Sequence, residues 1–418
     1  MRFGYACKTV GVQDANLVSC TLKNATLENI SRIIRANLDA LEAMIDFNVK
    51  SNIHLYRISS DIVPFATHDT NKLDWKNEFK QRFEDIGRKI TQNSIRVSFH
   101  PGQYCVLNSL NDSVVQNTIK DLVYHCDMLE LLNQDNKSKI VLHIGGVYGD
   151  KAQAINRFIV NFKKLPSNIK DRLVIENDDK NFNISDVLEI SKKINIPVVF
   201  DNLHNELNPS DEKKDEADWI KICAETWLGK DGVQKIHYSQ QKKGELKGTH
   251  SETIYIDTFV NFFEKLKTNE LDVMFEVKDK NLSTLKCINV ALNNSSASNL
   301  EKEWARYKYL VLSKSPIVYD EIRELLKDKN RSVAKDFYRK IESVQKIKED
   351  SKTEVNAAEH IWGYLNKSST NRDSNRYVKL LNEYKNGKVK VELIKKHLLK
   401  LAIIQNDQYL INSLYFYI

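Results

Sequence analysis

The first 290 residues repeat one pattern eight times, and this repeat restricts the fold more than any other feature. Each repeat starts with a short run rich in β-branched residues and continues, except after the second run, into a segment with helical periodicity. Parallel strands need such crossovers, and eight units in this length fit a closed (β/α)8 barrel of roughly 250 residues. A doubly wound open sheet usually has fewer strands and a glycine-rich first turn, which this sequence lacks. We predict strands at Arg2–Cys7, Ile53–Ser59, Ile95–Phe99, Lys139–Ile144, Arg172–Glu176, Pro197–Asp201, Val233–Tyr238 and Asp272–Val277.

The last part of the chain has a different pattern. Residues 293–299 are small and polar, as in a linker, and the segments beyond them all have helical periodicity. We predict a barrel domain over residues 1–292, a linker over 293–302 and a small all-helical domain over 303–418. Residues 300–418 carry 24 Lys and Arg against 16 Asp and Glu, whereas the preceding residues carry 39 against 40. A basic excess of this kind is typical of nucleic-acid contact or of a lysine-rich surface, and charge alone does not separate these two.

Several classes of protein are disfavoured by composition. The longest apolar runs have the length of strands, so we expect no membrane partner. The amino terminus reads as a strand and not as a signal peptide. The six cysteines are scattered without a CxxC pair, which indicates reduced thiols and an intracellular location.

Histidines and carboxylates gather at the ends of the predicted strands, where barrel enzymes have their chemistry. A lone histidine is more often a hydrogen-bonded core or loop residue. Many imidazoles and carboxylates on one face, however, would repel one another or lack partners unless they bound metal. Zn²⁺ takes about four ligands and Mn²⁺ about six, so nine indicate two or three divalent ions, an arrangement that clamps the attacking and leaving oxygens in phosphodiester cleavage. The nine are His68, His100, His143, Glu176, Asp201, His204, His237, His250 and Glu276.

Sequence spacing supports a shared site. Asp201 and His204 are three residues apart across a strand-to-loop turn, so both can reach one ion. Lys235 and His237 are two apart and therefore share one face of the seventh strand. A lysine beside a cation cluster either pairs with a spare carboxylate or is carboxylated and bridges the ions as an anion. Both alternatives remain open from spacing alone.

Three further lysines fall near the same strand ends. Lys278 follows Glu276 by two residues, and we interpret it as a phosphate contact. Lys242 and Lys243 lie in a basic loop after the seventh strand. Such a loop suits phosphate contacts, although a solvated loop has the same composition.

Five motifs resemble those of the ultraviolet-damage endonucleases. They occur in family order over roughly residues 1–290 and are Ser60–His68, His100–Tyr104, His143–Gly146, Glu176–Asp179 and Lys235–His237. The resemblance implies a TIM barrel of the endonuclease IV-like type with two to three divalent ions, manganese being favoured and zinc the alternative. It also implies single-strand incision 5′ to photoproducts in double-stranded DNA, to start excision repair, with abasic sites as a further candidate lesion.

The resemblance also implies roles for single residues. The nine ligands named above fall at the family's metal positions, and Lys235 falls at that of its carboxylated lysine. We take Glu176, Lys235 and His68 as catalytic. Gln103 and Tyr104 fall where the family inserts a polar–aromatic pair at the lesion, a step that costs least where the base stack is already weakened.

The same resemblance reaches the first strand. Tyr5 falls where an aromatic side chain of the family lines the damaged nucleotides. Just beyond it the chain departs from the family, because Cys7-Lys8-Thr9-Val10 stands where an Asn is usual. The lesion preference therefore stays open.

Other functions share parts of this pattern. A metal-dependent sugar isomerase or epimerase uses the same barrel, but the His100–Tyr104 motif and the number of histidines count against it. An abasic-site nuclease would differ only at Gln103 and Tyr104. A non-catalytic DNA-binding protein would use the helical domain, where Tyr377 and Tyr384 alternate with lysines, as they also do on ordinary amphipathic helices. We predict a monomeric, metal-dependent endonuclease for ultraviolet-damaged DNA that needs no nucleotide cofactor.

Overall fold

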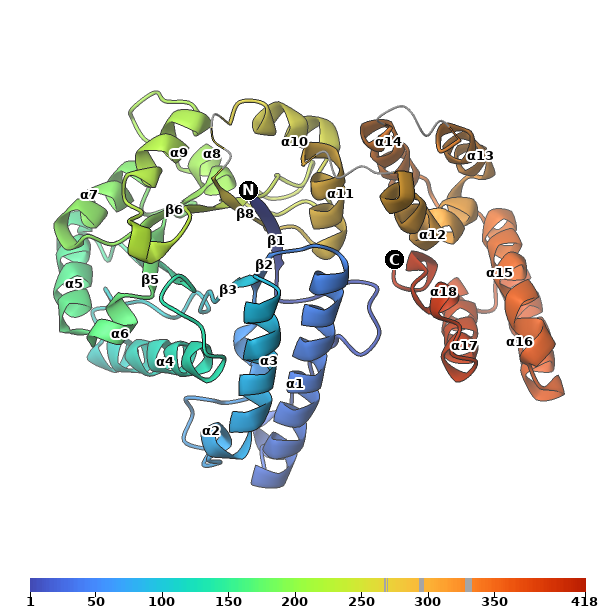
Figure 1. The fold of residues 1–418 in the computed structure, drawn as a ribbon, viewed down its shortest axis with the longest axis horizontal. Coiled ribbons are helices and arrows are strands. Elements are labelled where there is room, and N and C mark those ends of the chain that lie inside the picture. Colours follow the sequence, from blue (N-terminus) through green and yellow to red (C-terminus); the bar gives the residue numbers. More distant parts are fainter. Residues whose placement is uncertain (267, 269, 293–296, 328–332) are drawn as a thin grey trace. The chain divides into compact units, whose positions relative to one another are not determined.

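The chain forms a closed barrel of parallel strands. The structure, a computed structural model, describes residues 1–266, 268, 270–292, 297–327 and 333–418. Its eight strands follow the order β3-β2-β1-β8-β7-β6-β5-β4, and a parallel bridge between Phe99 and Ile140 joins the two ends of that order (Figure 1). The predicted (β/α)8 barrel is therefore confirmed. The strands are β1 (Arg2–Ala6), β2 (Leu55–Arg57), β3 (Arg96–Ser98), β4 (Ile140–His143), β5 (Leu173–Glu176), β6 (Val198–Asp201), β7 (Lys235–Tyr238) and β8 (Asp272–Phe275).

Helices connect the strands along the outside of the barrel. The first one illustrates why they form: the Thr26 side chain accepts a hydrogen bond from the Asn29 amide, and buried residues such as Ile30, Ile34 and Leu41 recur at helical spacing. The helices are α1 (Leu27–Lys50), α2 (Trp75–Glu78), α3 (Lys80–Gln92), α4 (Asp112–Leu131), α5 (Lys151–Lys164), α6 (Ser167–Lys170), α7 (Ile184–Ile194), α8 (Asn202–Leu207), α9 (Glu216–Ala224), α10 (Ile256–Phe263) and α11 (Asn281–Ala291).

One local expectation is met only in part. The stretch after the second strand is less regular, as the sequence predicts, but it also contains the 13-residue helix α3. Its buried residues Phe83, Ile86 and Ile90 repeat every three or four positions. The polar residues between them obscured this narrow apolar stripe.

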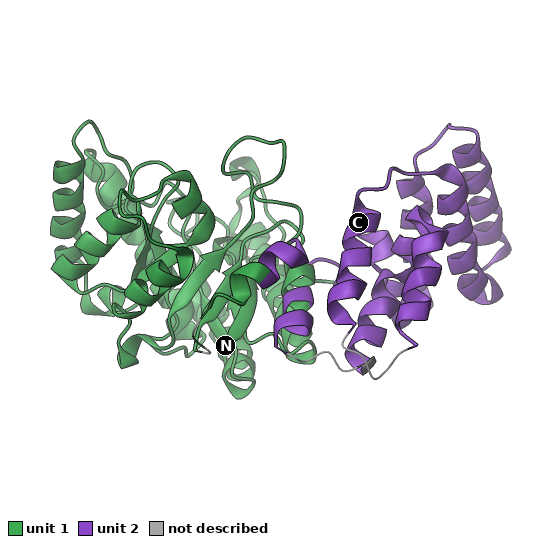
Figure 2. Cartoon of the chain, turned by 90° about the horizontal axis from the view of Figure 1, so that it is seen from above, with its two compact units in different colours: residues 1–9, 14–254, 261–285 green, residues 10–13, 255–260, 286–418 purple. Residues whose placement is uncertain are grey.

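The contacts divide the chain into two units (Figure 2). Unit 1 contains residues 1–9, 14–254 and 261–285, and unit 2 contains residues 10–13, 255–260 and 286–418. Unit 2 therefore includes the start of α10 and most of α11. Its further helices are α12 (Ala297–Lys314), α13 (Pro316–Leu325), α14 (Ala334–Gln345), α15 (Ser351–Leu365), α16 (Asn371–Lys385), α17 (Val391–Ile404) and α18 (Gln408–Ile411).

The predicted linker overlaps the first helix after the barrel. Residues 297–302 belong to α12, and residues 293–296 lie outside the described residues. The bounds that we predicted for the two domains, 1–292 and 303–418, remain predictions.

Unit 2 has its own hydrophobic core. Helices α12, α15, α16 and α17 pack against one another, and Tyr377 and Tyr384 are 3% and 9% exposed in the middle of this cluster. The tyrosines that alternate with lysines are therefore core residues, as on an ordinary amphipathic helix. Within the part of the chain that the structure covers, we find no helix with the length and hydropathy needed to cross a lipid bilayer.

Candidate metal centre

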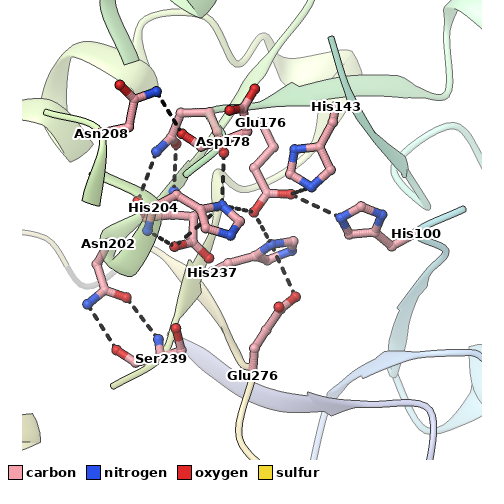
Figure 3. A network of polar contacts seen from close by, with 12 residues as sticks. His100, His143, Glu176, Asp178, Asn202, His204, Asn208, His237, Ser239 and Glu276 are labelled. Carbon is pink, nitrogen blue, oxygen red and sulfur yellow. Dashed lines mark hydrogen bonds and ion pairs between the residues drawn. The ribbon is translucent and has the colours of Figure 1, made fainter. Parts of the chain in front are cut away.

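Alternation along the strands places the candidate ligands inside the barrel. Val141, Val174 and Val199 form a buried cluster across β4, β5 and β6. Two residues further along each strand, and so on the same face, come His143, Glu176 and Asp201. The site is therefore one layer above packed valines, at the carboxyl ends of the strands. Figure 3 shows the side chains of His100, His143 and His237 gathered around that of Glu176.

Glu176 is the centre of the cluster. It is 1% exposed, and its Oε1 is 2.7 Å from Nδ1 of His237. Its Oε2 is 3.1 Å from Nε2 of His100 and 3.5 Å from Nε2 of His143. Burial alone would raise the pKa of this carboxyl, but His237, His143 and the hydrogen bond from His100 hold it well below its usual range. Glu176 is therefore an anion.

Six side chains form three overlapping groups, each with ligand atoms within 4.8 Å of one another. The first is His100, Glu176 and His237, the second is Glu176, Asp201 and His204, and the third is Asp201, His237 and Glu276. Each pair of groups shares one residue, namely Glu176, Asp201 or His237. Because a carboxylate has two oxygens, Glu176 and Asp201 have the chemistry to bridge neighbouring ions.

Unpartnered atoms test whether cations fit this site. Oδ2 of Asp201, Nε2 of His237 and Nδ1 of His143 are buried and have no hydrogen-bond partner among the described residues. Burial raises the pKa of Asp201, and the charges of Glu176 and Glu276 add to this effect against the opposing charge of His204. Buried polar atoms without partners are costly, and divalent cations would satisfy them. The donor set of nitrogen and oxygen fits Mn²⁺ or Zn²⁺.

Backbone carbonyls orient two of the imidazoles. Nδ1 of His100 is 3.1 Å from the Pro101 carbonyl oxygen, and Nδ1 of His204 is 2.9 Å from that of Asn177. A ring nitrogen that faces a carbonyl oxygen must donate, so neutral imidazoles keep Nε2 as an acceptor. In a neutral His100, Nε2 and the Glu176 oxygen that it faces are both acceptors and repel each other. A proton or a metal ion between these two atoms makes the contact favourable.

His204 carries a proton in the absence of metal. Burial of the imidazole would lower its pKa, but the carboxylates of Asp201, Glu176 and Glu276 outweigh burial and raise it to about 9. One imidazolium thus offsets part of the negative charge of the site. Divalent ions would displace this proton, because metal ligation requires the neutral ring.

Arg57 belongs to the site although sequence reasoning missed it. Its Nη1 donates to Oε1 of Glu276, which is also 3.3 Å from Nδ1 of His237. Burial would raise the pKa of Glu276, but Arg57 and His237 lower it. Leu55 packs with Ala6 and Met274, and Arg57 follows it by two residues on the same strand. This position at the end of β2 could have identified Arg57 from sequence.

Two asparagines extend the strand pairing around the ligands, and sequence reasoning missed them too. Asn177 pairs through its side-chain amide with the backbone of Asp201, at 2.9 and 3.0 Å. Asn202 pairs in the same way with the backbone of Ser239, at 2.8 and 3.0 Å (Figure 3). Each asparagine directly follows the last residue of its strand, and this position could have identified both from the sequence.

Three of the nine predicted ligands are outside the three groups. His143 borders Glu176, as described above. His68 is exposed, where its Nδ1 accepts a hydrogen bond from the Thr70 amide at 3.1 Å. His250 lies in the loop after β7, where its backbone bridges to Gln241. The structure does not bring His68 or His250 into the cluster.

Lys235 lies beside the cluster inside the barrel. It is 1% exposed and shares its strand face with His237. Burial and the charges of Arg96 and Arg57 hold its pKa well below the usual lysine value. These surroundings therefore favour the neutral amine over the ammonium form.

The predicted lesion-contacting residues differ in exposure. Gln103 and Tyr104 form the tip of a turn that is closed by a 2.9 Å hydrogen bond from the Cys105 amide to the Gly102 carbonyl. Both are exposed, Tyr104 to 82%.

The side chain of Tyr5 does not reach the surface in this structure, and its predicted contact with the damaged nucleotides stays a prediction. Its side chain is 0% exposed. Its hydroxyl lies 2.7 Å from Thr9 Oγ1 and donates to Asn48 Oδ1 at 2.8 Å. Tyr5 faces inward from β1, and its hydroxyl already has hydrogen-bond partners within the protein.

Two of the three predicted phosphate-contacting lysines converge on one carboxylate. Nζ of Lys242 and of Lys278 are each 2.9 Å from Oε1 of Glu252. These hydrogen bonds lower the pKa of Glu252. Lys243 is exposed beside them.

The chain is similar to known proteins over both of its parts. The family model for UV-endonuclease UvdE matches residues 1–304, and a model for a protein of unknown function, DUF1722, matches residues 308–418. A UV DNA damage endonuclease of Clostridium perfringens (strain 13 / Type A) is 39% identical over 399 residues, which cover 94% of this chain and 95% of that protein. One of Bacillus cereus (strain Q1) is 34% identical over 300 residues, which cover 69% and 93%.

A solved structure is similar to the same part of the chain. The crystal structure of SacUVDE is 38% identical, covers 71% of this chain and 99% of its own, and matches with a TM-score of 0.66. Residues 1–304, which the UV-endonuclease UvdE model matches, contain every strand of the barrel and all of the candidate ligands. The chain therefore belongs to the UV-endonuclease UvdE family.

Proposed function

We propose that the protein is a divalent-metal-dependent endonuclease that makes a single-strand incision 5′ to photoproducts in double-stranded DNA. The observation that carries this proposal is the set of three ligand groups that share Glu176, Asp201 and His237. Neighbouring metal ions suit phosphodiester cleavage because they act on the attacking and the leaving oxygen together. The family supplies the substrate class, since the relatives are named as UV DNA damage endonucleases.

Two to three ions would occupy the cluster, with Mn²⁺ favoured and Zn²⁺ as the alternative. Bound ions would supply Lewis acidity toward the phosphate and a nucleophile near neutral pH. Glu176 would bridge ions, and His143 would add its nitrogen at the edge. We keep His68 and His250 in the proposed ligand set because both follow strands whose carboxyl ends face the cluster.

Lys235 has the properties of a carboxylation site. Its buried Nζ has a pKa well below the usual lysine value; in the neutral form it can attack CO₂, losing one proton to leave a carbamate whose carboxylate is a further anionic ligand. The carbamate would remove the cost of burying an amine between Arg57 and Arg96. We propose that Lys235 acts in this form.

The exposed loops would hold the DNA. We propose that the Gln103–Tyr104 turn inserts into the duplex at the lesion and that Lys242, Lys243 and Lys278 contact phosphates. Positioning through phosphates and recognition through bases are separate tasks in protein–DNA interfaces. The protein would act as a monomer inside the cell, where its substrate is.

Supercoiled plasmid nicking tests the proposal. Irradiated, abasic and undamaged plasmids are incubated with Mn²⁺-loaded protein, with and without EDTA. We expect nicking of irradiated plasmid, loss of nicking in EDTA and loss in Glu176→Gln. Glu189→Gln is the matched control, because Glu189 is an exposed carboxylate on α7 that pairs with Lys193.

Other outcomes would change the proposal in defined ways. Nicking of abasic plasmid alone would keep the metal centre and change the lesion class. Equal nicking of undamaged plasmid would contradict lesion recognition. No nicking by protein that retains its metals would contradict the endonuclease activity itself.

A further inference from the structure

The loop that follows β7 is held in one conformation by its own hydrogen bonds. We call residues 241–250 the Leu246 loop. Its ends are joined by a bridge between Gln241 and His250 and by a 2.7 Å bond from the Lys242 amide to the Thr249 carbonyl. Gly244 and Gly248 have φ angles of 80° and 86°, which other residues rarely adopt, and these let the chain turn back.

One side chain organises the interior of this loop. The Gln241 amide donates to the Leu246 carbonyl at 2.9 Å and accepts from the Gly248 amide at 2.8 Å. The Thr249 amide also donates to the Leu246 carbonyl, at 3.1 Å. The backbone of Leu246 is thus bonded twice within the loop.

The side chain of Leu246 points away from the protein. It is 83% exposed, and Lys243 and Lys247 beside it are also exposed. A single exposed leucine is common on protein surfaces. Here, however, the leucine stands at the tip of a lysine-containing loop, and two hydrogen bonds to its carbonyl hold the backbone of that tip.

Topology places this tip across the barrel from the Tyr104 turn. The turn follows β3 and the Leu246 loop follows β7, and in the closed ring these strands are four steps apart in either direction. Both loops leave from the carboxyl ends of the strands, where the cluster around Glu176 lies. The two most exposed large hydrophobic side chains of that face, Tyr104 and Leu246, therefore flank the cluster from opposite sides.

We propose that Leu246 is a second wedge, which enters the base stack on the side of the metal centre opposite Tyr104. This inference rests on the proposed function. Apolar side chains such as leucine are used in this way by proteins that unstack base steps, and flanking lysines would hold the adjoining phosphates. Leu246 would make the protein select DNA that a lesion has already weakened, because the cost of unstacking is lowest there.

The test uses a synthetic duplex with one cyclobutane dimer and 2-aminopurine beside it. Leu246→Ala is compared with Leu228→Ala, a matched control because Leu228 is 55% exposed and precedes β7, away from the carboxyl ends of the strands. We expect Leu246→Ala to lower kcat/KM by about tenfold and to abolish the 2-aminopurine fluorescence increase on binding. Leu228→Ala is expected to behave as wild type, and all three proteins should hold equal metal.

A second substrate separates a wedge from a structural role. When mismatches flank the dimer, the stack is already open, so Leu246→Ala should regain wild-type kcat/KM. A loss that persists on the mismatched duplex would overturn the inference, as would a Leu246→Ala variant that matches Leu228→Ala on the paired duplex. If wild-type protein cleaves neither duplex, the proposed function fails, which is a different result from cleavage that ignores Leu246.

Discussion

The side-chain amide of Asn177 pairs with both backbone groups of Asp201, as the next residue of a strand would. Asp201 N donates to Asn177 Oδ1 at 2.9 Å, and Asn177 Nδ2 donates to the Asp201 carbonyl at 3.0 Å. The carbonyl of Asn177 also accepts from His204 Nδ1 at 2.9 Å. Asn177 is not a candidate ligand, but it positions two candidate ligands, Asp201 and His204.

We predict that Asn177→Ala weakens metal binding. The change leaves both backbone groups of Asp201 unpaired in a buried place and costs about 1–3 kcal/mol of unfolding free energy. Metal content after dialysis should fall, and nicking should fall with it. Added Mn²⁺ should restore part of the activity, because the ligands themselves remain.

A second buried amide provides the control for this prediction. Asn289 is 5% exposed and donates to the Tyr338 hydroxyl at 2.7 Å in unit 2. Asn289→Ala should cost stability in urea denaturation without changing metal content. Equal metal content in both variants would show that Asn177 does not position the ligands.

The buried imidazole of His125 should make the free energy of unfolding depend on pH. Its Nδ1 donates to the Asp121 carbonyl and its Nε2 lies 2.8 Å from Ser60 Oγ, and burial lowers its pKa from 6.5 to about 4. Between these pH values the unfolded chain binds this proton and the folded chain does not. Stability is therefore lost as pH falls from 6.5 to 4, by up to about 3 kcal/mol.

Urea denaturation of metal-free protein at pH 7 and pH 4.5 measures this effect. His143, whose pKa is also lowered by burial to about 4, is present in both wild type and His125→Gln, so the difference between the two proteins reports on His125. The wild type should lose more stability than the variant between the two pH values. An identical loss would show that His125 is not the titrating group.

Lys286 and Glu342 form a buried ion pair whose rupture should destabilise unit 2. Their charged atoms are 2.8 Å apart and their side chains are 5% and 11% exposed. Removing one partner of such a pair leaves a buried charge, and we expect Glu342→Ala to cost about 3 kcal/mol. Arg339→Ala breaks an exposed pair with Asp257 and should cost under about 1 kcal/mol. Urea denaturation that ranks the two variants equally would contradict this account.

Carboxylation of Lys235 has a direct spectroscopic test. Protein incubated with ¹³C-bicarbonate and Mg²⁺, which is diamagnetic, should give a carbamate resonance in ¹³C NMR. Lys235→Gln should lack this resonance. Its presence in Lys235→Gln, or its absence from wild type, would show that the lysine stays an amine.

The barrel could be predicted from sequence because its strands are short apolar runs separated by helical periods. The six grouped ligands could be predicted for a related reason: parallel strands bring their carboxyl ends to one face, so position along the strand is enough. Helix α3 was missed because its three large buried apolar residues stand among charged ones. In all three cases the spacing of apolar residues along the sequence determined whether the element or site could be predicted.

Loop geometry could not be predicted in the same way. His68 and His250 follow strand ends, yet the path of a loop decides where its side chain lies, and both stay outside the groups. Tyr5 illustrates a second limit, because its burial depends on partners such as Asn48 that are distant in sequence. Arg57 and Asn177 were missed because their only signal is their position at the end of a strand, and neither residue type is a usual metal ligand.

Incision of one defined duplex tests the central claim most directly. A synthetic duplex with a single cyclobutane dimer is labelled on the damaged strand and incubated with wild type or Glu176→Gln at known Mn²⁺ content. The account predicts one cut immediately 5′ to the dimer, made by the metal-loaded wild type alone. A wild type that holds its metals and leaves the strand intact, or cuts an undamaged duplex equally well, would contradict it.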